Sequence, residues 1–151
     1  MVRRLELDVS YAARRPWAPG PRQLARWAKA ALAPMRRPAV LSVRVVGQAR
    51  SLSLNAHYRH KDQPTNVLSF EGAGSAPDGR YFLGELVICA PVVAREALAY
   101  GKTLESHWAH MTIHGVLHLL GFDHEERLEA VKMTAREIQI LDRLGFSNPY
   151  G

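Results

Sequence analysis

Residues 105–124 read ESHWAHMTIHGVLHLLGFDH, a stretch that is rich in histidine. We expect one helix from Glu105 to Leu120, closed by Gly121. Glycine readily takes the left-handed conformation that ends a helix and turns the chain back. The expected helix carries four histidines, at positions 107, 110, 114 and 118. Such a concentration of imidazoles in one helix predicts a site with histidine chemistry.

The spacing of the last histidines is that of a metal site. His114 and His118 are four residues apart, so their side chains lie one turn apart on the same helix face and can bind one ion. The turn at Gly121 would bring His124 to the same ion. The pattern H-x-x-x-H-x-x-G-x-x-H has the spacing of the metzincin zinc motif. Three nitrogen ligands leave one position open, as in catalytic zinc sites, where zinc lowers the pKa of a bound water toward ~7.

One residue departs from the metzincin pattern. Gly115 stands where zinc peptidases have the glutamate that acts as general base, and glycine cannot accept a proton. Either another group activates the water, or an RNA substrate supplies its own 2′-hydroxyl as nucleophile. Asp123 is a candidate base, or a carboxylate that orients a metal ligand. It could equally be a capping residue before the acidic start of the next helix.

Other residues of this region have simpler interpretations. We interpret His110 as a hydrogen-bonded packing residue, although it could also orient a ligand or reach the substrate. His107, nearer the helix start, is predicted to be solvated. We expect the three tryptophans, at positions 17, 27 and 108, to lie in the core, and Cys89 to be a buried thiol.

The remaining periodicities predict an α+β domain that spans residues 1–151, with a sheet of about four strands. Alternating and β-branched patterns predict strands at Leu5–Val9, Val40–Val46, Asn66–Phe70 and Phe82–Cys89. Between the last two, residues 72–79 read GAGSAPDG, which predicts a long hairpin loop. Further helices are expected between Pro21 and Pro34 and over Gln48–Tyr58, Pro91–Tyr100 and Glu125–Leu144.

Charge is distributed unevenly along the chain. Residues 1–61 contain 13 Lys and Arg against two acids, a net charge of +11, whereas residues 62–151 carry −5. A basic half attracts polyanions, so we expect RNA contacts there, with Arg14, Arg15, Arg36 and Arg37 as candidates. The single cysteine, the lack of a roughly 20-residue apolar run and the lack of a signal-peptide pattern predict a cytoplasmic protein that does not enter membranes.

Several blocks of the sequence resemble those of the YbeY endoribonucleases, also called rRNA maturation factors. The resemblance rests on HGVLHLLGFDH at 114–124 and on LN at 54–55, YR at 58–59, KD at 61–62, PTNVLSF at 64–70 and GELVIC at 84–89. These blocks span about half of the chain, and the spacing between them also fits. The departures are slight: Glu85 stands where the family usually has Asp, Glu71 where Pro is common, and His60 where the residue is usually small.

The resemblance implies a small mixed sheet flanked by helices and one zinc ion on His114, His118 and His124. It implies a bacterial cytoplasmic endoribonuclease for single-stranded RNA that acts in small-subunit (16S) rRNA maturation and ribosome quality control. The implied partners are precursor rRNA and the small ribosomal subunit, with ribosomal proteins or an assembly GTPase.

The resemblance also implies a functional arginine at Arg59. A guanidinium offers a planar fork to phosphoryl oxygens, on which charge builds during phosphodiester cleavage. Glu85, in an apolar strand, is expected either to pair with an arginine or to reach the cleft, because an unpaired buried carboxylate is costly. Two alternatives to a nuclease remain. One is a metallopeptidase, against which Gly115 argues. The other is a non-catalytic assembly factor with a structural zinc, although structural zinc sites usually have four protein ligands.

Overall fold

Four strands form one mixed sheet in the computed structural model, which describes residues 4–12, 16–59, 65–122 and 126–151. The strands are β1 (Leu5–Tyr11), β2 (Ala39–Val46), β3 (Val67–Ser75) and β4 (Tyr81–Cys89). Their order in the sheet is β1-β2-β4-β3. The first three in this order run parallel, and β3 pairs antiparallel with β4. The predicted α+β class and the mixed four-stranded sheet are confirmed.

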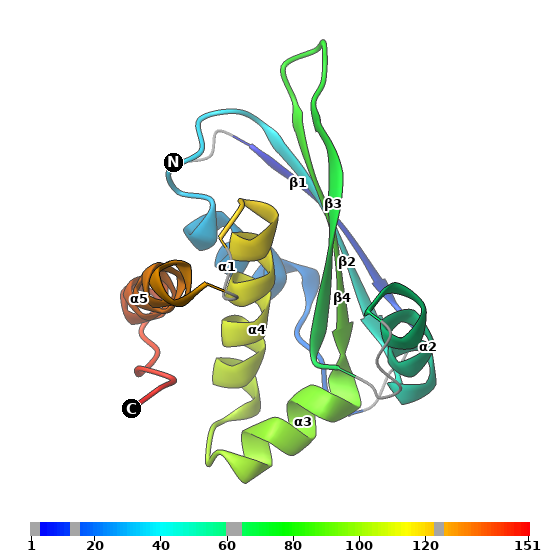
Figure 1. The fold of residues 1–151 in the computed structure, drawn as a ribbon, viewed down its shortest axis with the longest axis vertical. Helices are drawn as coiled ribbons and strands as arrows, with labels where there is room; N and C mark the ends of the chain where they lie inside the picture. The colour runs from blue at the N-terminus through cyan, green and yellow to red at the C-terminus, as the bar shows by residue number, and fades with distance from the viewer. Residues whose placement is uncertain (1–3, 13–15, 60–64, 123–125) are drawn as a thin grey trace.

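Helices cover the sheet unequally, as Figure 1 shows. The described helices are α1 (Pro21–Ala31), α2 (Gln48–Arg59), α3 (Ala90–Ala99), α4 (Leu104–Leu119) and α5 (Arg127–Arg143). Helices α1, α4 and α5 lie on one side of the sheet, and α2 lies on the other (Figure 1). On β2, Leu41, Val43 and Val45 point into the main core, because side chains alternate between the two faces of a strand. No helix in the described part of the chain is long and apolar enough to cross a membrane.

Helix α4 is the centre of the molecule and ends where the sequence predicts. At its start, the Thr103 hydroxyl accepts a hydrogen bond from the Ser106 amide at 3.1 Å, which satisfies one of the unpaired first-turn donors. At its end, Gly121 has φ of 101°. Its amide donates to the His118 carbonyl at 3.0 Å, and the Phe122 amide donates to the Leu117 carbonyl at 3.0 Å. These two bonds form a Schellman motif, which fixes the direction in which the chain leaves the histidine helix.

The predicted hairpin between β3 and β4 is confirmed, but its loop is shorter than the predicted residues 72–79. Strand β3 continues to Ser75, across a register irregularity between Glu71 and Gly74, and β4 begins at Tyr81. A methyl group on Gly72 would lie 2.5 Å from the Phe82 carbonyl oxygen, so the glycine permits close approach of the two strands. Gly72 and Gly74 therefore belong to strand β3, and Gly79 lies in the shorter turn.

The tryptophans do not share one environment. Trp27 and Trp108 are buried in the main core, as predicted, and Cys89 is a buried thiol. Trp17 is 43% exposed, so its prediction as a core residue is wrong. It lies in the segment before α1, outside the periodic pattern that buries Trp27.

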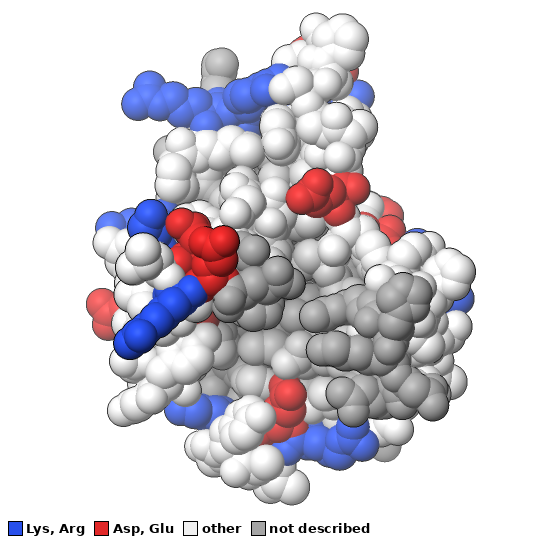
Figure 2. All heavy atoms as spheres, viewed as in Figure 1, with Lys and Arg blue, Asp and Glu red and all other residues white. Residues whose placement is uncertain are grey.

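The described basic residues do not form one continuous band on the face in Figure 2, where Lys and Arg gather in separate groups and acidic side chains lie between them. Of the predicted RNA-binding arginines, Arg14 and Arg15 lie outside the described residues, and Arg36 is exposed. Arg37 hydrogen-bonds the Ser75 hydroxyl at 2.6 Å and the Gly79 carbonyl at 3.3 Å, so it holds the β3–β4 hairpin. An RNA-binding role for the basic half stays a prediction.

Candidate metal centre

Helix α4 presents His114 and His118 side by side. Their ring centroids are 4.9 Å apart, and their planes are inclined by 79°. Both residues are half-buried. The four-residue spacing therefore produces the expected pair of neighbouring imidazoles on one helix face.

A buried carboxylate fixes the orientation of the first ring. The Nδ1 atom of His114 lies 2.5 Å from Oε2 of Glu137, on α5, whose side chain is only 1% exposed. An ionised carboxylate can only accept, so Nδ1 carries the proton of this bond. In the neutral ring the lone pair is then on Nε2. Metal-ligating histidines almost always make such a contact through the nitrogen that does not bind the ion, so His114 fits a metal ligand.

Glu137 is held ionised by its neighbours. Its burial opposes ionisation, but hydrogen bonds from His110, His114 and Tyr150 outweigh that cost and lower the pKa of the carboxyl group to about 2. His110 Nε2 lies 3.1 Å from Oε1 of Glu137, and the Tyr150 hydroxyl donates to the same oxygen. Burial, and then the bond to Glu137, raises the pKa of Tyr150, which therefore stays a donor.

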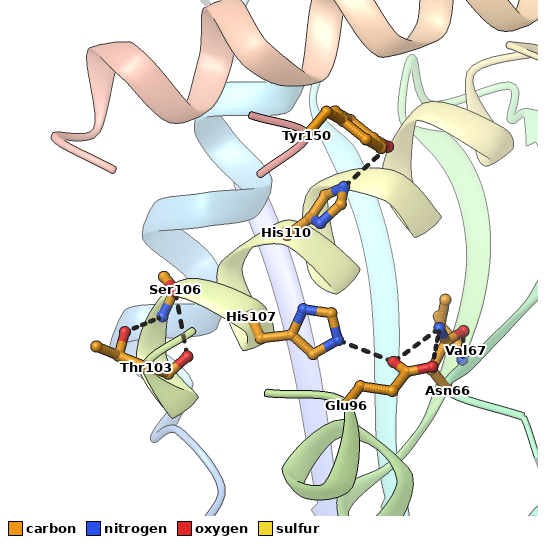
Figure 3. A network of polar contacts seen from close by, with 8 residues as sticks. All are labelled: Asn66, Val67, Glu96, Thr103, Ser106, His107, His110 and Tyr150. Atoms are coloured by element: carbon orange, nitrogen blue, oxygen red, sulfur yellow. Dashed lines mark hydrogen bonds and ion pairs between the residues drawn. The ribbon is translucent and has the colours of Figure 1, made fainter. Parts of the chain in front are cut away.

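His110 is a hydrogen-bonded packing residue, as predicted, and it also connects the C-terminal segment to the site. It is 8% exposed, and its Nε2 lies 3.2 Å from the Tyr150 hydroxyl (Figure 3). The same Nε2 lies 3.1 Å from Oε1 of Glu137. Through these bonds α4, α5 and the C-terminal segment meet around one carboxylate.

Glu137 and Tyr150 were not predicted from the sequence as residues of the site. A signal for Glu137 was present, because α5 buries Met133, Ile140 and Leu141, and Glu137 falls on the same stripe, four residues after Met133. An acid on the apolar stripe of a helix requires a buried partner. Tyr150 follows the last helix and carries no comparable signal.

A second polar cluster lies one turn toward the start of α4. His107 is 5% exposed, so its prediction as a solvated residue is wrong. Its Nε2 lies 2.8 Å from Oε1 of Glu96, and the Asn66 amide nitrogen lies 3.1 Å from the same oxygen (Figure 3). Burial alone would raise the pKa of Glu96, but the bonds from His107 and Asn66 lower it overall. The cluster joins α3, α4 and the start of β3.

Gly115 has a structural reason to be glycine. A methyl group at this position would lie 2.8 Å from Cδ2 of Leu86 and 3.2 Å from Cγ2 of Val67. The Gly115 carbonyl also lies 3.2 Å from the Ser69 hydroxyl, which donates to it. Position 115 therefore faces the sheet at a close helix–strand contact, where a glutamate side chain would have to displace Leu86.

The remaining predicted site residues are only partly covered. His124 and Asp123 lie outside the described residues, as does the side chain of Arg59, whose backbone forms the last position of α2. Among the residues that are described, no group of three or more His, Cys, Asp or Glu side chains could hold a metal ion. The described part of the site therefore brings together two of the three predicted ligands.

Glu85 has an arginine partner, as the sequence predicted. The Nη2 atom of Arg44 lies 3.1 Å from the Glu85 carboxylate.

Similarity to a solved structure supports the fold. The solution structure of TM1509 from Thermotoga maritima matches 92% of this chain and 91% of its own length, with a TM-score of 0.57. The sequence identity is 21%, so this match supports the fold alone.

Sequence relatives identify the family. The profile described as "Endoribonuclease YbeY" matches residues 20–145. A protein of Stenotrophomonas maltophilia named "Endoribonuclease YbeY" is 52% identical over 97% of this chain and 94% of its own length. One of the same name from Xanthomonas campestris pv. campestris is 51% identical over the same shares. The chain belongs to the endoribonuclease YbeY family.

Proposed function

We propose that this protein is a zinc-dependent endoribonuclease specific for single-stranded RNA, and that it works in the cytoplasm on the maturation and quality control of the small ribosomal subunit. Family membership supports the endoribonuclease activity. The observation that carries the metal dependence is the His114–His118 pair with Glu137 bound to Nδ1 of His114.

His114 and His118, with His124 as the third ligand, are the residues that would hold zinc. When bound, zinc acts as a Lewis acid on a phosphoryl oxygen and favours a hydroxide-like nucleophile at neutral pH. Glu137 keeps the His114 ring in one tautomer and one orientation, so this ligand would be oriented before an ion binds.

The protein groups must handle both the proton and the phosphate charge. Gly115 cannot accept a proton, so Asp123 is the candidate base, and it would take the proton from whichever nucleophile attacks the phosphorus, a water molecule or the 2′-hydroxyl of the RNA. Arg59 donates its guanidinium fork to the phosphoryl oxygens as their charge grows in the transition state. A single-stranded substrate suits this scheme, because an unpaired strand can bend its scissile phosphate into the site.

The proposal is tested by incubating the pure protein with a labelled structured RNA, with and without a chelator, and mapping the ends of the products. We expect cuts in unpaired segments that the chelator abolishes and added zinc restores. Casein in a parallel digest should remain intact. Cleavage that survives complete removal of metal, or cuts confined to paired segments, would overturn the proposal.

The ribosomal role is tested in cells. Cells that lack this protein should accumulate 16S precursors with unprocessed ends. Wild-type protein should correct the defect and His118→Ala should not. Normal 16S ends in the absence of the protein would show that its RNA substrate lies elsewhere.

A further inference from the structure

A cavity of about 330 Å³ opens beside the histidine helix. Glu96 and Asn66 form part of its wall, His107 and His110 line it from α4, and Tyr100 and Lys102 contribute from the segment between α3 and α4. The cavity lies next to the metal centre on the same helix, because the ring of His110, which lines the cavity, and the ring of His114 have centroids 6.3 Å apart. An RNA strand bound at His114 and His118 can therefore place an adjacent nucleotide in this cavity.

Glu96 gives the cavity its hydrogen-bonding character. Its Oε1 accepts from His107 at 2.8 Å and from Asn66 at 3.1 Å, whereas among the described residues Oε2 accepts a longer, shared bond from Asn66, at 3.3 Å, and no other. A carboxylate has about four acceptor sites, so capacity remains, mainly on Oε2. The side chain is 24% exposed, which lets a ligand reach it. Since an ionised carboxylate cannot donate, its partner must bring an N–H or O–H group.

Tyr100 and Lys102 add features that suit a nucleotide. The Tyr100 ring is 62% exposed and packs edge-to-face on His107, with ring centroids 5.9 Å apart. An exposed aromatic ring beside a hydrogen-bonding wall is how single-stranded RNA bases are bound, with stacking on the ring and recognition along the base edge. Lys102 supplies a positive charge for the phosphate backbone.

We propose that this cavity binds one unpaired base of the RNA held at the metal centre, and that Glu96 favours bases with an exocyclic amino group over uracil. The amino groups of cytosine, adenine and guanine can donate to Oε2 of Glu96. Uracil has no amino group, and the one donor on its base-pairing edge, N3–H, lies between two carbonyl oxygens, which repel the carboxylate. This inference rests on the proposed ribonuclease activity and adds base selection to it.

The test uses short single-stranded RNAs of one sequence, in which each position near the cut is varied in turn among the four bases. We expect uracil to lower kcat/KM by about ten- to a hundredfold at one position only, the range for a lost hydrogen bond to a charged group. Glu96→Gln should reduce this discrimination to about threefold or less, because an amide can donate as well as accept. Glu105→Gln, at an exposed acid in the first turn of α4, is the control and should keep the wild-type preference.

Two variants of Tyr100 test the same subsite independently of any effect that Glu96→Gln has on the fold. Tyr100→Ala should raise KM for all four bases with zinc content unchanged, and Tyr100→Phe should behave like wild type. Equal cleavage of all four bases at every position, or an unchanged preference in Glu96→Gln, would overturn the base subsite while leaving the ribonuclease proposal intact. If no RNA is cleaved, the ribonuclease proposal fails. In that case the base subsite is tested separately, by comparing the affinities of the same RNAs for wild type and for Glu96→Gln, measured by fluorescence anisotropy.

Discussion

The Nδ1 atom of His114 lies 2.5 Å from Oε2 of the buried Glu137, and this contact joins the histidine helix α4 to the last helix, α5. Two further donors, His110 and Tyr150, hold the same carboxylate. The orientation of a predicted metal ligand is therefore set by Glu137, 23 positions away in the sequence.

Glu137→Gln tests this relationship. The amide keeps the shape of the side chain but loses its charge, so it holds the His114 ring less firmly and makes Nε2 a poorer ligand. Zinc affinity should fall about 10- to 100-fold, measured by competition with a chromogenic chelator. Glu129→Gln, on the same helix in an exposed pair with Lys132, should bind zinc like wild type. Equal zinc affinity in Glu137→Gln and wild type would refute the orienting role.

Arg59 should act on the phosphate without holding metal. Arg59→Ala should keep the zinc content and melting temperature of wild type but slow RNA cleavage by roughly a hundred- to a thousandfold, the cost of one lost donor to a developing oxyanion. Arg59→Lys should recover only part of the rate, because an ammonium lacks the fork. Arg136→Ala, on α5 beside Gln139, is the control and should cleave at the wild-type rate. Unimpaired cleavage by Arg59→Ala would remove this residue from the mechanism.

Glu96 should contribute to acid sensitivity. Its folded-state pKa is lowered, so its ionised form stabilises the protein above the unfolded-state value of about 4.3. That contribution is lost as the pH falls through the folded-state pKa. Glu96→Gln should therefore show a smaller loss of unfolding free energy than wild type as the pH is lowered below about 4.3 in urea titrations. Parallel pH dependences for the two proteins would show that the Glu96 bonds do not favour its ionised form.

Gly84 should be far less replaceable than another glycine with positive φ. It has φ of 134°, and a methyl group there would lie 2.0 Å from the Phe70 carbonyl oxygen. Gly101 has φ of 65° with nothing within 4 Å of the added carbon. Gly101→Ala should cost about 1–2 kcal/mol, the left-handed penalty alone, whereas Gly84→Ala should cost more than this and separate β3 from β4. Equal unfolding free energies of the two variants would contradict the close strand contact.

The parts of the fold that follow from local periodicity could be predicted. Helix α4 and its closure at Gly121 depend on residues within one turn of each other, and the observed Schellman bonds involve only Leu117, His118, Gly121 and Phe122. The spacing of His114 and His118 is likewise local, so their adjacency follows from helix geometry.

The errors arose where tertiary contacts override local signals. His107 near a helix start has no sequence mark of burial, and its partner Glu96 comes from another helix. Gly72 favoured a loop, although it serves close strand pairing. Trp17 is apolar but lies where no element covers it fully. Glu137 could have been found as an acid on a buried stripe, but its three partners could be identified only in the folded chain.

The most direct test of the central claim is the zinc content of wild type and of His114→Ala, His118→Ala and His124→Ala, measured by elemental analysis after dialysis. We expect about one zinc ion per wild-type chain, as for a three-histidine catalytic site, and a large loss in each variant. The same samples should lose RNA cleavage in proportion to lost zinc. Full zinc content in all three variants would contradict the account.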